Sequence, residues 1–289
     1  MKAILTDIKK DLEDLFNSDK IDKAIYLNNS INKKFVSTNY SPMYFVGNYE
    51  AKTVFVMLNP GSAIDTKYSF DTSEKKNYKN LNDFLEKYLH KHINFGKINY
   101  DKVDNFDLKQ AAFLYHFKNS GLSIPDFVNE KDNEKKSILK ADAKETVLMN
   151  KLQLELIPYC SVEFIGVMDN TKLAINNFNI LEPHLLRIFD AIIEYDRQYV
   201  VFGAKQFYFL LYAYNIKHLN SVIFHDLKTF EIEGLKKKVN CRVVEINYKN
   251  KKIKGLIPYS FPRRDLPNAY DKMKKYGELC FQEFINIFN

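Results

Sequence analysis

The segment Thr53–Leu58 constrains the fold most, because this apolar run stops abruptly on Asn59-Pro60-Gly61. A continuous apolar run of this length is typical of a central strand in a parallel sheet that is covered on both faces. Pro60 biases Asn59 towards extended backbone angles, and Gly61 permits a tight turn. The motif is therefore either a simple turn or a device that holds the Asn59 amide at the tip of a buried strand.

Strands alternate with helices along the rest of the chain. We expect helices over 3–35, 80–89, 107–117, 143–153, 183–195, 204–214 and 266–288. We expect strands near 43–46, 154–157, 198–202 and 222–224, and a hairpin of 241–248 with 251–259. This pattern predicts a three-layer α/β/α fold around a central, mainly parallel sheet. We predict one domain over residues 1–289, with an N-terminal helical extension over 1–38 and a helical insertion or lid over 74–150.

The composition excludes several classes of protein. The chain has 289 residues, of which 46% are hydrophobic, so it can bury a sizeable core. No apolar run approaches the roughly 20 residues that span a bilayer. The cysteines at 160, 241 and 280 are far apart and form no CxxC pair, which argues against a disulfide framework or a zinc site. We expect a soluble, cytoplasmic monomer.

Positive charge is concentrated near the C-terminus. Residues 234–275 contain 13 Lys and Arg against 3 Asp and Glu, although the whole chain carries only +7. Such a basic region indicates a surface for a polyanion such as nucleic acid. A solvated, lysine-rich surface explains the same charge equally well.

Three segments in order carry a family resemblance: VFVMLNPGS, LELIPYCS and GLIPYSFPRRDLPN, with YVVFGAKQFYFLL between the last two. Together they resemble the uracil-DNA glycosylase superfamily over roughly residues 40–275. The nearest motif is that of the mismatch-specific type, which reads Gly-x-Asn-Pro-Gly. The resemblance implies a monofunctional DNA glycosylase that flips a base and cleaves its N-glycosidic bond to leave an abasic site. It implies DNA as the partner and neither a metal nor an organic cofactor.

By this resemblance, Asn59 is the catalytic residue that positions the attacking water. Hydrolysis of an N-glycosidic bond passes through an oxocarbenium-like sugar, which needs a placed water more than a strong base. An amide cannot deprotonate water, but it can orient the water and so reduce the entropic cost of attack.

The second family motif corresponds to Pro258-Tyr259-Ser260 and the residues that follow it. A flipped base leaves a hole in the duplex that an inserted side chain fills, and Phe261, Pro262 or Arg264 could be that wedge. Arg263 and Arg264 would also meet phosphates. A proline-bounded loop with surface arginines is the simpler interpretation.

Five further residues match family positions. Small hydroxyl residues at strand ends pinch DNA phosphates in the family, which points to Ser62, Ser161 and Ser260, although serine is also common in turns. Tyr68 and Phe70 follow the first motif, where the family often stacks an aromatic ring on the base. Core packing explains these two rings as well.

Two residues depart from the family pattern and bear on the base pocket. Met57 replaces the leading glycine of the first motif, which narrows the pocket and argues against ordinary uracil excision. Glu155 lies where uracil-removing relatives tend to have an asparagine that reads the pyrimidine edge. An ionised carboxylate only accepts hydrogen bonds, so it would favour the exocyclic amine of cytosine over the carbonyl of uracil. Alternatively, Glu155 points into solvent at the end of a helix.

Several functions remain open from the sequence. A cytosine reader and an enlarged pocket would suit a bulky modified cytosine, as in defence against phages whose DNA carries such bases. A non-catalytic DNA-binding module on the same fold is the main alternative. A glycosidase acting on RNA or on a small molecule, or another α/β enzyme, is a third.

Overall fold

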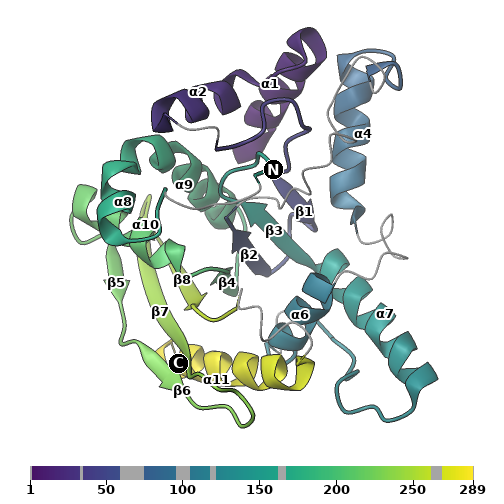
Figure 1. Ribbon diagram of the computed structural model, residues 1–289, viewed down its shortest axis with the longest axis vertical. Coiled ribbons are helices and arrows are strands. Elements are labelled where there is room, and N and C mark those ends of the chain that lie inside the picture. Colours follow the sequence, from purple (N-terminus) through teal and green to yellow (C-terminus); the bar gives the residue numbers. More distant parts are fainter. Residues whose placement is uncertain are drawn as a thin grey trace.

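A computed structural model describes residues 2–32, 35–58, 75–95, 105–117, 122–161, 167–261 and 269–288. In this part of the chain, eight strands form one sheet in the order β1-β3-β2-β4-β8-β7-β5, with β6 paired to β7 (Figure 1). The strands are β1 (Phe45–Gly47), β2 (Thr53–Met57), β3 (Lys151–Glu155), β4 (Tyr199–Phe202), β5 (Val222–Phe224), β6 (Lys228–Phe230), β7 (Val239–Tyr248) and β8 (Lys251–Pro258).

The centre of the sheet is parallel and its margins are antiparallel. Strands β3, β2, β4 and β8 run parallel to one another. Strand β1 joins β3 in the opposite direction, as β7 joins β8 and as β5 and β6 join β7. The protein is therefore an α/β protein with a mixed sheet, and its parallel centre agrees with the prediction from the alternating strands and helices.

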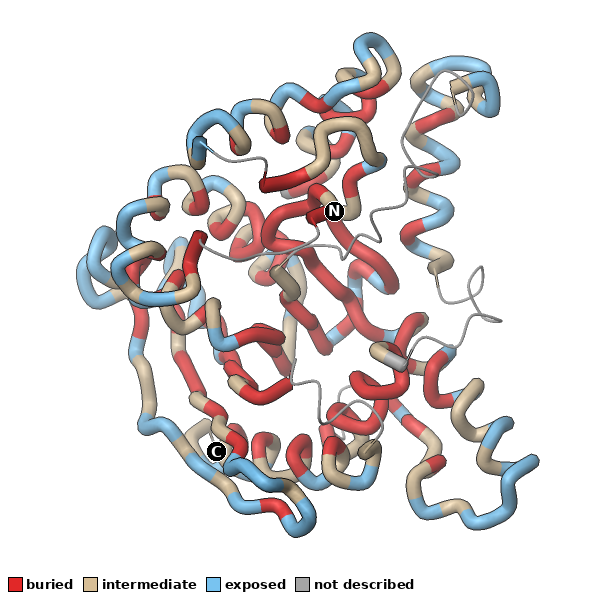
Figure 2. Tube along the Cα trace, in the orientation of Figure 1, coloured by how far each residue is buried: buried red, intermediate tan, exposed pale blue. Residues whose placement is uncertain are grey.

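Helices cover both faces of this sheet. One core cluster joins the sheet to α1 (Lys2–Ser18), α2 (Asp22–Ile31), α4 (Leu81–Ile93), α8 (Thr171–Asn176), α9 (Phe178–Ile193) and α10 (Gln206–Lys217). A second core cluster joins the other face to α6 (Asn105–Leu114), α7 (Asn133–Asn150) and α11 (Tyr270–Phe288). Figure 2 shows the strands buried between these helices.

Strand β2 illustrates why an apolar run becomes a central strand. Val54 and Val56 enter the core on the α9 face, while Phe55 between them enters the core on the α11 face. All three side chains are fully buried. A strand covered on both faces has no solvent side, so its sequence shows no alternation of polar and apolar residues.

The predicted elements differ from the structure mainly at β3. The sequence predicts a helix through Gln153 and a strand over 154–157, but α7 ends at Asn150 and β3 begins at the next residue. Strand β6 was not predicted. The β7–β8 hairpin is confirmed, and its turn residues Lys249 and Asn250 have φ angles of 48° and 60°. Two positive φ angles give the turn a twist that matches the twist of the flanking strands.

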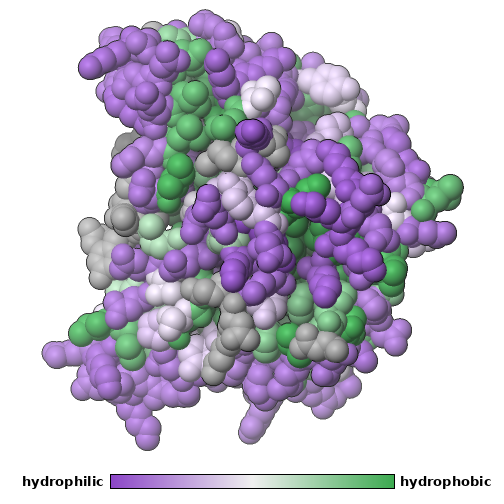
Figure 3. Space-filling view, turned by 180° about the vertical axis from the view of Figure 1, so that it is seen from behind, coloured by the Kyte–Doolittle hydropathy of each residue, from purple (hydrophilic) through white to green (hydrophobic). Residues whose placement is uncertain are grey.

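The predicted insertion supplies part of a structural layer. Its helices α6 and α7 pack with α11 against the sheet, where they help to bury Phe55, Val201 and Leu256. The described residues contain no helix that is long and apolar enough to cross a membrane. Figure 3 shows that hydrophobic residues on the reverse face form separate patches among hydrophilic ones.

Candidate functional site

The four parallel strands end at one edge of the sheet, which we call the carboxyl edge. After β2 the chain proceeds to β3 on one side, and it then returns past β2 to β4 on the other side. The connection through α6 and α7 and the connection through α8 and α9 cover opposite faces. The gap between the ends of β2 and β4 is thus a topological switch point, where open α/β sheets bind their ligands.

Met57 and Gly203 face each other at this switch point. The Gly203 amide donates to the carbonyl oxygen of Val56 at 2.8 Å, which aligns the ends of the two strands. A Cβ atom at Gly203 would lie 2.5 Å from the Met57 sulfur. The methionine side chain therefore rests on the bare glycine backbone and remains partly exposed. The structure thus shows which residue Met57 contacts, namely Gly203. The narrowing of a base pocket by Met57 stays a prediction.

Glu155 lies beside Met57 in the neighbouring strand, since the two residues are register partners. Its side chain is only 1% exposed, so the alternative that it points into solvent from a helix is wrong. Gln153 Nε2 donates to Oε1 at 2.7 Å, while Oε2 is buried and accepts or donates no hydrogen bond in the part of the chain that the structure describes. Burial raises the Glu155 pKa to about 8, against the weaker opposing effects of Gln153 and Lys151.

A neutral Glu155 changes the hypothesis about the base. That hypothesis assumes an ionised carboxylate that only accepts hydrogen bonds, but a group with a pKa of about 8 is mostly protonated at neutral pH. Because Oε1 already accepts from Gln153, the free Oε2 is the natural site for the proton. Glu155 can therefore donate a hydrogen bond, which suits a carbonyl oxygen or an unprotonated ring nitrogen.

Glu155 ends a row of buried polar side chains along β3. Lys151, Gln153 and Glu155 alternate with Leu152 and Leu154, so all three project onto the face covered by α6. Lys151 Nζ donates to Gln110 of α6 and, at 3.0 Å, to Gln153 Oε1. Gln110 Nε2 also donates to Gln153 Oε1, at 3.1 Å. The hydrogen bonds run from Lys151 at the amino end of β3 through Gln153 to Glu155, and they hold the Glu155 carboxyl group in place.

The polar alternation in β3 was the signal that sequence reasoning missed. The predicted helix covers the start of this segment, so Lys151, Gln153 and their partner Gln110 are absent from the predicted site. Alternation at every second position favours a strand with one polar face. Here α6 buries that polar face, which only the tertiary structure shows.

Arg187 of α9 secures the end of β3 from the other face. Its Nη2 donates to the carbonyl oxygens of Glu155 and Leu156 at 3.1 and 2.6 Å. Its guanidinium carbon lies 4.7 Å from the centre of the Tyr44 ring. Tyr44 in turn donates to the buried Asp11 carboxylate of α1 at 2.6 Å. The backbone beneath Glu155 is thereby tied to two helices.

The second motif is more deeply buried than the resemblance implies. Phe261 is fully buried, with its ring 5.2 Å from Phe55 and 5.3 Å from Phe113 between ring centres. A side chain in this position packs the core, so the expected wedge role for Phe261 is not consistent with this structure. Its burial follows from the α6 and α11 layer, which the sequence motif does not reveal.

Of the three serines that the resemblance assigns to phosphate binding, Ser161 and Ser260 are buried, and Ser62 lies outside the described residues. Ser260 is buried, and its hydroxyl accepts from the Asn240 amide at 3.3 Å. Ser161 is buried, and its hydroxyl has no hydrogen-bond partner within the described ranges. Phosphate contacts by these two serines remain predictions. The other predicted site residues lie outside the described residues, namely Asn59, Ser62, Tyr68, Phe70, Pro262, Arg263 and Arg264.

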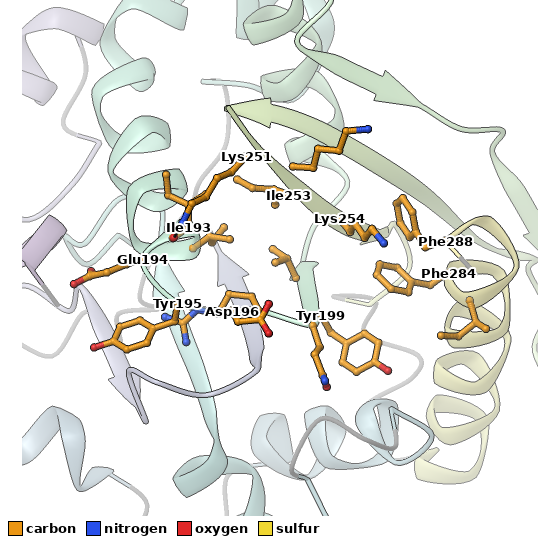
Figure 4. A pocket seen from close by; sticks show the side chains of 16 residues that line it. Ile193, Glu194, Tyr195, Asp196, Tyr199, Lys251, Ile253, Lys254, Phe284 and Phe288 are labelled. Atoms are coloured by element: carbon orange, nitrogen blue, oxygen red, sulfur yellow. Dashed lines mark hydrogen bonds between the residues drawn. The ribbon is translucent and has the colours of Figure 1, made fainter. Parts of the chain in front are cut away.

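A pocket of about 800 Å³ lies at the opposite, amino edge of the sheet (Figure 4). Its walls come from the ends of α9 and α11 and from the first residues of β4 and β8, including Tyr199, Lys254 and Phe288. Both charge signs line it, from Glu194 and Lys251 among others. The pocket is remote from Met57 and Glu155, so it does not belong to the carboxyl-edge site.

The described residues contain no cluster of His, Cys, Asp or Glu that could hold a metal ion. His92 is buried beside Tyr88, and desolvation lowers its pKa to about 4, which keeps this imidazole neutral. Comparison of the sequence with protein-family models and with curated proteins finds no match. The fold and the carboxyl edge are therefore the basis of any functional assignment.

Proposed function

We propose that the protein is a DNA base glycosylase whose site lies at the carboxyl edge, around Met57, Glu155 and the motif that begins at Asn59. The observation that carries the proposal is the buried carboxyl group of Glu155 beside the switch point, whose Oε2 has no hydrogen-bond partner among the described residues. A buried polar atom without a partner is costly, and a ligand that satisfies it recovers that cost.

The proposed reaction divides two tasks between Asn59 and Glu155. Asn59 orients a water molecule whose oxygen bonds to C1′ of the deoxyribose, and that water loses a proton to solvent. The C1′–N bond breaks, and its electron pair leaves with the base. The Oε2 hydroxyl of neutral Glu155 donates to a carbonyl oxygen or ring nitrogen of the departing base, which stabilises the charge that develops there. The departing base takes a proton from solvent, so the products are a free base and an abasic sugar.

This arrangement favours a pyrimidine of the cytosine type. Cytosine has an unprotonated ring nitrogen at N3, whereas the N3 of uracil carries a hydrogen. Donation from the Glu155 hydroxyl to that nitrogen would therefore select cytosine, while donation to a carbonyl oxygen would suit both bases. The Met57 side chain on Gly203 restricts one side of the pocket, so the base would extend away from that contact. A modified cytosine from phage DNA remains the specific substrate that we propose, with defence against such phages as the biological setting.

The decisive assay measures abasic sites in duplex and single-stranded DNA that contain uracil, cytosine or modified cytosines. Asn59→Ala should abolish base release while DNA binding persists. Asn150→Ala is the matched control, because it removes an exposed amide just before β3, at the amino edge. Full activity of Asn59→Ala would rule out the mechanism.

The second candidate function is DNA binding without catalysis. The observation that favours it is the burial of Glu155, which is 1% exposed and so has almost no contact with solvent. A binding module would hold DNA tightly with a strong dependence on salt, yet release no base from any substrate in the panel. The same assay therefore separates the two functions.

A further inference from the structure

Helix α10 carries apolar side chains at its partly exposed and exposed positions as well as at its buried ones. Its inner face supplies buried residues to the core, namely Phe207, Leu210, Leu211, Ala213 and Tyr214. The remaining positions would normally be charged on a surface helix. Instead they include Tyr208, Phe209, Tyr212 and Ile216, and the last two are 38% and 50% exposed. Such a surface is typical of an interaction site.

Aromatic rings from three elements meet beside this helix. The Tyr208 ring centre lies 5.2 Å from that of Phe224 in β5 and 6.1 Å from that of Tyr259, which directly follows β8. Tyr212 lies one turn further along α10, 6.2 Å from Tyr208. The guanidinium carbon of Arg242 lies 4.9 Å from the Tyr208 ring centre. We call these five residues the aromatic platform. Tyr212 is 38% exposed, and the other four are partly exposed.

The aromatic platform lies at the carboxyl edge. Tyr208 is in the first turn of α10, soon after the end of β4, and Tyr259 follows the last residue of β8. Arg242 is the register partner of Ile257, one residue before the end of β8. The aromatic rings pack against the core on the α9 face, whereas Glu155 projects onto the α6 face. A chain that crosses this edge could contact both.

The charge of the aromatic platform indicates the kind of ligand. Arg242 is partly exposed, and its Nη1 donates to the backbone carbonyl of His225 at 3.0 Å. Its guanidinium lies over the Tyr208 ring and also interacts with Tyr259, so its positive charge lies among the aromatic rings. One exposed tyrosine, the partly exposed rings beside it and a stacked arginine suit unpaired nucleotides, because every base offers a face for stacking and every phosphate a negative charge.

We propose that the aromatic platform binds unpaired nucleotides of single-stranded DNA next to the base that enters the carboxyl-edge site. This inference rests on the proposed function, since it assumes that DNA reaches that edge. It assigns a binding surface for the DNA strand to residues for which the resemblance implies no role. The bases would stack on Tyr212 and Tyr259, and Arg242 would contact the backbone.

The test uses a single-stranded oligonucleotide that contains 2-aminopurine, whose fluorescence is quenched when it stacks on an aromatic ring. Tyr212→Ala should weaken binding by roughly tenfold and remove much of the quenching. Tyr212→Phe should retain both, because it keeps the ring. Tyr26→Ala is the matched control, since Tyr26 is a 67% exposed tyrosine on α2. Arg242→Gln should weaken binding and reduce its dependence on salt.

Unchanged affinity and quenching in both Tyr212→Ala and Arg242→Gln would overturn the inference. It would also fail if these variants altered self-association in light scattering while DNA binding stayed constant. The proposed function is judged separately. Loss of stacking in Tyr212→Ala, together with base release that still depends on Asn59, supports both. Stacking without base release from any substrate removes the proposed reaction but retains the platform.

Discussion

The sulfur of Met57 rests directly on the backbone of Gly203, across the switch point of the sheet. A Cβ atom at residue 203 would lie 2.5 Å from that sulfur and 3.4 Å from Phe55 Cε1. A side chain at residue 203 would therefore displace the Met57 side chain, which occupies that space. The pair forms one wall of the candidate site.

Gly203→Ala should destabilise the protein, because Met57 must leave its position to admit the new methyl group. We expect a loss of about 1–2 kcal/mol in the free energy of unfolding, measured by urea denaturation. The loss should be smaller in a Met57→Ala background, where the space is free. A double-mutant cycle measures this coupling, and additive effects would contradict the contact.

Glu155 should make stability depend on pH. Burial raises its pKa in the folded state to about 8, above its ordinary value of 4.5. The folded state therefore holds more protons between these values, so the contribution to stability is complete below about pH 4.5 and is lost as pH rises towards 8. Melting temperatures from pH 5 to 9 should fall less in Glu155→Gln than in the unmodified protein. Parallel pH profiles for the two proteins would show that the carboxyl group is already ionised.

Glu155→Gln also distinguishes a donor from an acceptor in base release. An amide keeps a donor near the position of Oε2, so activity at pH 7 should persist in this variant. The decline in activity as Glu155 ionises near pH 8 should disappear, whereas Glu155→Leu should lose activity at every pH. Inactivity of Glu155→Gln at pH 7, with the fold intact by circular dichroism, would instead support a carboxylate acceptor.

Arg187→Met should destabilise the fold and disturb the candidate site together. The variant loses the charged hydrogen bonds to the carbonyls of Glu155 and Leu156, at a cost of about 2–3 kcal/mol. Arg197→Met is a close control, since Arg197 donates to the carbonyls of Tyr49, Ala51 and Ala191 near the amino edge. Both variants should lower the free energy of unfolding, but only Arg187→Met should reduce base release below the melting temperature.

Gly277→Ala should be among the most damaging single changes in the second core cluster. A Cβ at residue 277 of α11 would overlap the Phe113 carbonyl oxygen of α6, and backbone atoms cannot move aside as a side chain can. We expect a loss of at least about 2 kcal/mol, measured by thermal unfolding. Glu278→Ala, at the next residue of the same helix, provides the comparison, because Glu278 is partly exposed. Equal stability of the two variants would contradict the close crossing of these helices.

Local sequence patterns predicted a helix or strand correctly where the pattern is compatible with only one kind of environment or turn. The apolar run at Thr53–Leu58 has a single stable environment, between two helical layers, and β2 lies there. The hairpin at Lys249 and Asn250 follows from two strand patterns and a short turn. The start of β3 was mistaken for helix although Lys151, Gln153 and Glu155 alternate with leucines, as in a strand. Only the burial of these polar side chains under α6 has no local signal.

The sequence alone determined the alternation of strands and helices, because periodicity and turn residues act over a few positions. The tertiary structure decided which side chains share an environment. It placed Phe261 in the core, against the expected wedge, and it buried Glu155 so that desolvation favours its neutral form. Both outcomes arise because helices distant in the sequence shield these residues from solvent, and no local sequence pattern predicts that burial.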